Sequence, residues 1–180
     1  MRLFIAIEFP EEVREAIALD TEKLRNHFQS GRFVQRQNYH LTLAFLGETD
    51  PSRLTQIYDA MDCCGSPAFP ISVGALGRFR RRDGDVLWRS INAPEELSIL
   101  QNKLSDALKI RDFSLEDREF RPHLTLARSA KLRSNIHWGA LSSQTRPALT
   151  FTAREITLFR SDRGASGQVY TPLRQKELIQ

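Results

Sequence analysis

The chain has 180 residues, of which 41% are hydrophobic and 27% are charged, and this is typical of one globular domain. Its apolar stretches are too short to span a membrane, and Glu8 and Pro10 interrupt the first of them, so we expect no signal peptide. The only cysteines, Cys63 and Cys64, are adjacent and match no metal spacing. We therefore expect a cytoplasmic protein, and nothing in the sequence indicates more than a monomer. The net charge of +4 favours anionic partners.

The first predicted elements are a strand, a helix and a second strand. An apolar run over residues 3–9 ends at Pro10, where the sequence Pro-Glu-Glu favours a helix N-terminus, since proline lacks only an unneeded N–H group there. Apolar residues at helical spacing predict that this helix continues to near Gly31; they are Val13, Ile17, Leu24 and Phe28. The strand HLTLAFLGE follows over 40–48. A helix over 51–61 and a strand near 69–79 are predicted next.

The same landmarks recur in the second half of the chain. The sequence His-Leu-Thr-Leu-Ala begins at His40 and again at His123, displaced by 83 positions, and Pro-Glu-Glu begins at Pro10 and again at Pro94, displaced by 84. Two matched landmarks in the same order indicate a duplicated strand-helix-strand unit, starting near residues 2 and 86. The helix of the second unit places four leucines on one side: Leu97, Leu100, Leu104 and Leu108.

The remaining elements are predicted to be hairpin strands. The Asp83-Gly84 pair favours a tight hairpin that returns through VLWRSI, and a looser hairpin over 161–168 follows a strand near 149–160 and returns through VYTPL. No linker separates the halves. We therefore predict one two-lobed α+β domain over residues 1–180, with two antiparallel sheets backed by helices and an active-site cleft between them.

The repeated strand places a histidine and a threonine on one face. Side chains alternate along a strand, so we expect His40, Thr42 and Ala44 to face away from Leu41, Leu43 and Phe45, which would pack in the core. His123 and Thr125 repeat this pattern. Two facing histidines suit general acid-base catalysis, because one imidazole can be neutral and the other protonated near neutral pH. The two threonine hydroxyls could donate hydrogen bonds to a bound anion. Such a site could cleave a phosphodiester without a metal or another cofactor.

These motifs resemble those of the two-histidine phosphoesterase superfamily. The strings NYHLTLAFLGE and FRPHLTLAR, with the opening RLFIAIEFP and the closing YTPL, are similar to the bacterial and archaeal RNA 2′,3′-cyclic phosphodiesterases, also called 2′-5′ RNA ligases. The resemblance implies metal-independent hydrolysis of an RNA 2′,3′-cyclic phosphate end to a 2′-phosphate, possible joining in reverse, and catalysis by His40 and His123. It implies phosphate contacts from Thr42, Thr125 and Arg128. We expect His123 to be the base and His40 the acid, although the sequence does not order these roles.

Three further sequence features bear on the substrate. Phe4 and Trp88 occupy equivalent positions, six residues before Pro10 and Pro94, and would face the cleft, where an aromatic ring can stack on a terminal base. The arginine-rich stretch 78–82 is either a solvated hairpin tip or a basic edge that steers RNA.

Several alternatives remain open at this point. The same chemistry could act on a small cyclic nucleotide or an ADP-ribose cyclic phosphate. The chain could instead be a non-catalytic RNA-binding module, although binding alone would not require both imidazoles. A metal hydrolase is disfavoured, because two histidines 83 residues apart with no nearby carboxylate pattern form no recognisable ligand set.

Overall fold

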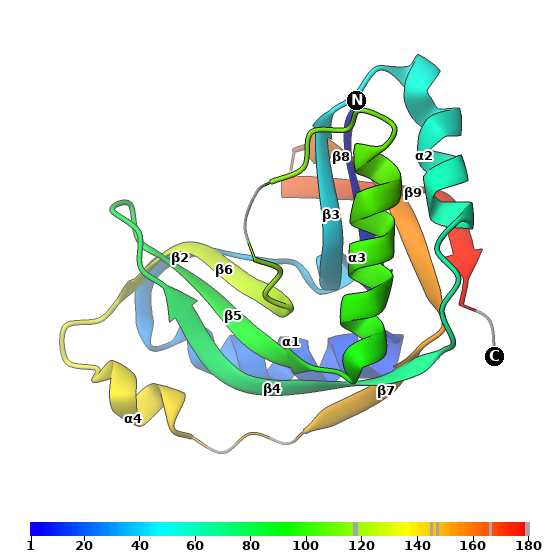
Figure 1. Cartoon of the computed structure of the whole chain (residues 1–180). Helices are drawn as coiled ribbons and strands as arrows, with labels where there is room; N and C mark the ends of the chain where they lie inside the picture. Colours follow the sequence, from blue (N-terminus) through cyan, green and yellow to red (C-terminus); the bar gives the residue numbers. More distant parts are fainter. Residues whose placement is uncertain (117–118, 145, 147, 166, 179–180) are drawn as a thin grey trace.

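The chain folds into two antiparallel sheets with helices packed against them (Figure 1). The computed structural model describes residues 1–116, 119–144, 146, 148–165 and 167–178. Sheet A has the strand order β3-β1-β8-β9, formed by β1 (Arg2–Glu8), β3 (His40–Glu48), β8 (Glu155–Gly164) and β9 (Gly167–Glu177). Sheet B has the order β2-β6-β5-β4-β7, formed by β2 (Phe28–Phe33), β4 (Phe69–Phe79), β5 (Asp85–Asn92), β6 (His123–Leu132) and β7 (Leu149–Ala153). The predicted α+β fold is confirmed.

Each sheet contains strands from both halves of the chain. The pairs β1–β3 and β5–β6 hold the two histidine strands, β3 in sheet A and β6 in sheet B. The strand that ends the first half, β4, then pairs with β5 in sheet B, whereas β8 from the second half pairs with β1 in sheet A. The two repeats therefore complete each other's sheets.

The helices are exchanged in the same way. The helices are α1 (Glu11–Arg25), α2 (Leu54–Asp62), α3 (Glu95–Lys109) and α4 (Trp138–Ser142), with short 3₁₀ helices η1 (Arg36–Asn38) and η2 (Pro51–Arg53). Figure 1 shows α1 lying along sheet B and α3 lying beside β3 of sheet A. Gln101 of α3 donates to the carbonyl of Leu43 at 3.3 Å. Each repeat's long helix thus covers the sheet that holds the other repeat's histidine strand.

The leucines of the two histidine strands are buried as predicted. Leu41, Leu43, Leu124 and Leu126 are at most 3% exposed and belong to one core cluster. The four leucines of α3 are also buried there. Each such side chain stabilises the fold by about 1.5–3 kcal/mol relative to an exposed one. The core therefore fixes which face of β3 and β6 remains for polar groups.

Two element boundaries differ from the prediction. The first helix ends at Arg25, and Phe28 instead begins β2, where it is buried and pairs with Leu132 of β6. An apolar residue in a strand can fill the core as well as one at helical spacing, so periodicity did not distinguish the two. The single strand near 149–160 is in fact β7 and β8, which leave Arg154 between them and join different sheets.

The predicted hairpins are present, and one is tighter than expected. The strands β4 and β5 flank Asp83-Gly84, and Gly84 has a positive φ of 116° that suits glycine. The strands β8 and β9 stay paired as far as Gly164 and Gly167. The hairpin that was expected to be loose over 161–168 is therefore the tighter one, and most of this stretch is strand. Ser166 of that stretch lies outside the described residues. The helix expected over 51–61 is confirmed as η2 followed by α2.

A buried ion pair joins α1 to sheet B. The guanidinium of Arg89, 2% exposed on β5, contacts the Asp20 carboxylate of α1 at 2.9 Å, and Arg146 contacts the same carboxylate at 2.9 Å. Asp20→Asn leaves two arginines without their counter-charge, so we expect it to lower the free energy of unfolding by about 3–5 kcal/mol, measured by urea denaturation.

The matched control is Asp62→Asn, which removes the partner of the partly exposed Arg174. A surface pair of this kind contributes about 0–1 kcal/mol. Equal losses in the two variants would contradict the importance of the Asp20 pair.

Candidate active site

The two histidine strands approach each other from different sheets. β3 of sheet A and β6 of sheet B are in contact although no ladder joins them. Their histidines are close enough for the charge of His123 to affect His40, and the Arg128 guanidinium of β6 affects His40 as well. The fold thus brings together three residues that the sequence singled out.

His40 is held in one orientation by hydrogen bonds to η1 and to its own strand and by two aromatic rings. Its Nδ1 donates to the carbonyl of Asn38 at 2.7 Å, which leaves Nε2 to accept from the Thr42 hydroxyl at 3.0 Å. The ring of Phe4 lies 4.9 Å from the imidazole and that of Tyr170 lies 5.3 Å from it, edge to face. These contacts fix the tautomer and present Nε2 as the reactive nitrogen.

His123 is held in the same way in the other sheet. Its Nδ1 donates to the carbonyl of Arg121 at 2.6 Å, again two residues earlier in the chain. Phe79 packs perpendicular to the imidazole at 5.5 Å, and Trp88 lies 6.4 Å away. The duplicated sequence therefore produces a duplicated orientation, with Nε2 as the nitrogen available for chemistry in both motifs.

A β-bulge follows each histidine-threonine pair. On β3, Ala6 pairs with Thr42 and Ile5 with Ala44, so Leu43 is the extra residue, and on β6 the extra residue is Leu126. A bulge re-aims the side chains beyond it. The prediction that Ala44 shares the face of His40 and that Phe45 faces the main core is therefore wrong. Ala44 joins the main core, and Phe45 packs beside Phe4.

The equivalent bulge on β6 determines where Arg128 points. Ala127 is buried in the core, and the exposed Arg128 lies on the side of His123 and Thr125. Arg128 occurs in no ion pair among the described residues, and its charge affects both His40 and Tyr170. Arg128 is therefore placed on the histidine face with its charge acting on His40, and its contact with a phosphate stays a prediction.

The environment of His40 disfavours its charged form. Burial lowers the pKa of His40 to about 4, the positive charges of Arg128 and His123 act in the same direction, and the hydrogen bond to Asn38 opposes them. In the absence of an anion His40 is therefore neutral at pH 7. A negative charge beside it would favour protonation.

Phe4 and Trp88 both lie on the predicted face, but they differ in exposure. Phe4 is 3% exposed beneath His40 and Tyr170, so its ring supports the imidazole and has no room for a base. Trp88 is half-buried, and its ring lies so close to Gly77 that any Cβ there would clash with it. Of the two predicted stacking residues, only Trp88 has an accessible ring.

Sequence reasoning missed two aromatic residues of the site, Phe79 and Tyr170. Tyr170 contacts His40 and Phe4 from β9, and burial raises the pKa of its phenol while Arg128 and Arg2 oppose that shift. Phe79 contacts His123 from β4. The only sequence signal was the position of Tyr170 in VYTPL, which pointed to a strand and not to the histidine it meets.

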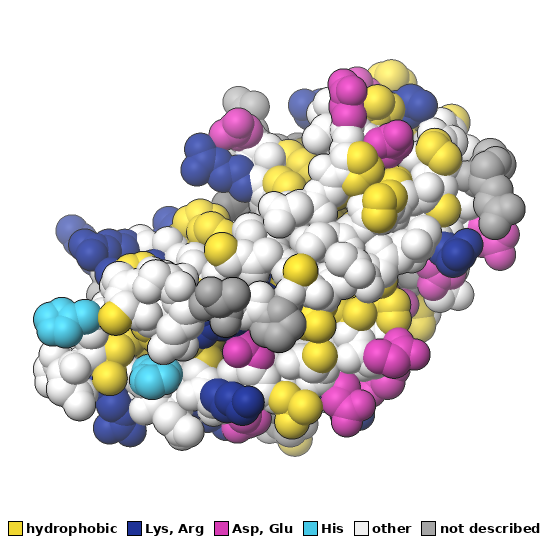
Figure 2. All heavy atoms as spheres, turned by 90° about the horizontal axis from the view of Figure 1, so that it is seen from below, with side chains coloured by type: hydrophobic (Ala, Val, Ile, Leu, Met, Phe, Trp, Pro, Cys, Tyr) yellow, Lys and Arg dark blue, Asp and Glu magenta, His cyan; other side chains and the backbone are white. Residues whose placement is uncertain are grey.

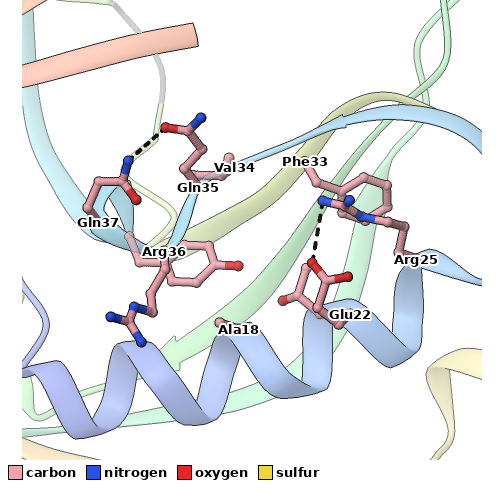
Figure 3. A pocket seen from close by; sticks show the side chains of 10 residues that line it. Ala18, Glu22, Arg25, Phe33, Val34, Gln35, Arg36 and Gln37 are labelled. Atoms are coloured by element: carbon pink, nitrogen blue, oxygen red, sulfur yellow. Dashed lines mark hydrogen bonds and ion pairs between the residues drawn. The ribbon is translucent and has the colours of Figure 1, made fainter. Parts of the chain in front are cut away.

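One hollow lies away from the two histidines. It measures about 400 Å³ and lies between α1 and the segment 33–39 (Figure 3). Its two arginines are paired with carboxylates, Arg25 with Glu22 and Arg36 with Glu11, so neither is left to bind an anion. A smaller hollow of about 70 Å³ reaches His40 and Tyr170.

The surface charge is unevenly distributed. On the face shown in Figure 2, most basic side chains lie toward the left and most acidic ones toward the right. At the tip of the β4–β5 hairpin, Arg80, Arg81 and Arg82 are exposed, whereas Arg78 is half-buried against Asp85 and Trp138. Within the described ranges, no helix is long and apolar enough to cross a membrane. Those same residues contain no cluster of three or more potential metal ligands among His, Cys, Asp and Glu.

The depressed pKa of His40 predicts a specific pH dependence of stability. Between pH 6.5, its ordinary pKa, and about 4, the unfolded chain binds a proton on His40 that the folded protein does not bind. The free energy of unfolding should therefore fall by about 3 kcal/mol as the pH falls through this window. Denaturation of His40→Asn should lack this decrease.

The control is His137→Asn, which alters an exposed histidine and should keep the wild-type slope. If His40→Asn and the wild type lost stability in parallel from pH 6.5 to 4, the burial effect on His40 would be refuted.

Comparison with known proteins places the chain in a family. The model of the 2′-5′ RNA ligase superfamily matches residues 9–165. The RNA 2′,3′-cyclic phosphodiesterase of Escherichia coli (strain K12) is 30% identical over 99% of this chain and 97% of its own length. That of Geobacillus stearothermophilus is 28% identical over 88% of this chain, which spans 52% of that relative.

Solved structures agree with the sequence comparison. A crystal structure of E. coli LigT complexed with 3′-AMP has a TM-score of 0.81 and 30% identity, and the match covers 99% of this chain and 98% of that one. The chain therefore belongs to the 2′-5′ RNA ligase superfamily and, within it, to the RNA 2′,3′-cyclic phosphodiesterase family.

Proposed function

We propose that this protein hydrolyses RNA 2′,3′-cyclic phosphate ends to 2′-phosphates, with His40 and His123 as acid and base. The observation that carries the proposal is the duplicated orientation of the two imidazoles. Each is held through Nδ1 by the carbonyl two residues earlier, and the charge of one affects the other across the two sheets. The family of relatives named RNA 2′,3′-cyclic phosphodiesterases supports the same reaction.

The reaction needs one proton removed and one supplied. The base takes a proton from water, whose oxygen attacks phosphorus, and the bond from phosphorus to the 3′-oxygen breaks. The acid protonates that oxygen, which leaves a 3′-hydroxyl and a 2′-phosphate. Each transfer contributes about a hundredfold to ten-thousandfold in rate. Thr42, Thr125 and Arg128 would hold the non-bridging oxygens, whose charge increases as water attacks.

We assign the acid role to His40 and the base role to His123. His40 is buried against Phe4 and Tyr170, and its low pKa in the free site means that it gains a proton only when a phosphate anion lies beside it. A group that becomes protonated on substrate binding is well suited to donate that proton to the departing oxygen. His123 would then accept the proton of the attacking water.

The half-exposed ring of Trp88 is the proposed stacking surface for the terminal base. It lies beside His123 and Phe79, on the same face as Thr125. Stacking on a base contributes about 1–3 kcal/mol. If the 5′-hydroxyl of a second RNA replaced water as the nucleophile, the same groups would form a 2′-5′ linkage.

The first test uses a short RNA with a 2′,3′-cyclic phosphate end in the presence of EDTA. We expect the wild type to open it to a 2′-phosphate, identified by phosphatase treatment and mass analysis. His40→Ala and His123→Ala should each be at least about a hundredfold slower. His137→Ala removes an exposed histidine outside the site and should keep the wild-type rate.

The outcomes separate the alternatives. Turnover of cyclic mononucleotides or ADP-ribose cyclic phosphate without opening of RNA would retain the chemistry and change the substrate. Binding of RNA without turnover of any of these substrates would make the protein a binding module. Loss of activity in EDTA would refute metal-independent catalysis.

A second test orders the two histidines. Bis(p-nitrophenyl) phosphate releases p-nitrophenolate, which needs no protonation to depart. We therefore expect His40→Ala to lose much less activity on this ester than on the cyclic RNA end, whereas His123→Ala should lose as much on both. The opposite pattern would exchange the two roles.

A further inference from the structure

Beside His40, three phenylalanine rings form a platform on the site-facing side of sheet A. Phe4 stacks on Phe159 at 5.2 Å, and Phe45, turned by the bulge at Leu43, packs against the same small cluster. Three polar side chains lie on these rings. His40 and Tyr170 lie over Phe4 at 4.9 and 4.8 Å, and the Arg2 guanidinium lies over Phe45 at 4.9 Å.

The duplicated motif matches Phe45, the ring beneath Arg2, with Arg128 of the second repeat. Phe45 lies five residues after His40, as Arg128 lies five residues after His123, and equivalent bulges precede both residues. The second repeat therefore carries an arginine where the first carries a phenyl ring. Arg2 of the neighbouring strand β1 stacks on that ring and supplies the missing guanidinium.

The guanidinium of Arg2 is available to an anion. Arg2 is exposed and takes part in no ion pair among the described residues. Glu48, which is opposite Arg2 in the strand pair, contacts the Met1 amino group at 3.5 Å instead. Phe45, the ring beneath Arg2, and Tyr170 pack against the same small cluster around Phe4, which places the Arg2 guanidinium on the Tyr170 side of the site.

We propose that Arg2, held over Phe45 with Tyr170 beside it, forms a second phosphate subsite that binds the next phosphate of the RNA chain. This inference rests on the proposed function, which places the terminal phosphate between the histidines. Arg2 is then a specificity residue that favours RNA ends over cyclic mononucleotides. The phenol hydroxyl of Tyr170 would donate a second hydrogen bond to the same phosphate.

The test measures binding, so it does not depend on turnover. Calorimetric titration would compare a nucleoside 2′-phosphate with a dinucleotide that ends in the same group and has one additional phosphodiester. We expect the wild type to bind the dinucleotide more tightly, and Arg2→Gln to reduce that preference about tenfold, as for loss of a charged hydrogen bond. For a longer single strand, the slope of log affinity against log salt concentration should become shallower by about 0.7.

The matched control is Arg160→Gln. Arg160 lies on β8 of the same sheet next to Phe159, so its side chain projects from the opposite face, where it pairs with Asp162. This variant should keep the wild-type preference for the dinucleotide. Arg2→Lys, which retains the charge without the planar stacking on Phe45, should recover part of the preference.

Three results would overturn the second subsite. The first is that the wild type binds the dinucleotide no more tightly than the nucleoside 2′-phosphate. The second is that Arg2→Gln keeps the full wild-type preference for the dinucleotide. The third is that Arg2→Gln and Arg160→Gln reduce this preference equally. Failure of the wild type to open any cyclic phosphate would contradict the proposed function instead. In that case a dinucleotide preference that depends on Arg2 would still support the subsite.

Discussion

Burial of the strand leucines is the constraint on which the site depends. Leu41, Leu43, Leu124 and Leu126 lie in one core, and side-chain alternation then leaves His40, Thr42, His123 and Thr125 on the opposite face. The order of residues in the repeated pentapeptide is therefore both a packing pattern and a functional one. The same burial fixes the strand register, since a slip of one residue would place the imidazoles in the core and the leucines outside it.

The site also carries an energetic cost. His40 is neutral in the free protein because its surroundings are apolar and positively charged. The same surroundings disfavour the protonated imidazole, which is the form that the proposed acid role requires. The Asn38 carbonyl and the rings of Phe4 and Tyr170 hold that imidazole in place. Orientation set in advance reduces the reorganisation needed when charge develops during the reaction. Some folding stability at acidic pH is lost as a result.

Local and periodic features were predictable from the sequence. The leucines of α3, the hairpin at Asp83-Gly84 and the two histidine-threonine faces each follow from spacing within one element. The bulges at Leu43 and Leu126 were not predictable, because an extra residue exists only relative to a partner strand. They reversed the expected orientations of Ala44 and Phe45 and turned Arg128 toward the histidines. Tyr170 and Arg2 were missed for a related reason, since strand pairing over long sequence distances brings them to His40 and Phe45.

The exchange of elements between repeats bears on how the fold arose. β4 completes the sheet of the second repeat, β8 completes that of the first, and each long helix packs on the sheet that holds the other repeat's histidine strand. A single repeat on its own would have had an unpaired sheet edge and an uncovered apolar face. Two identical copies could have satisfied both by swapping their last strand and their helix around a twofold axis. The present chain has the arrangement expected if such a swapped homodimer had been fused into one polypeptide, after which its two halves were free to diverge, so that one came to supply Arg128 and the other Phe45.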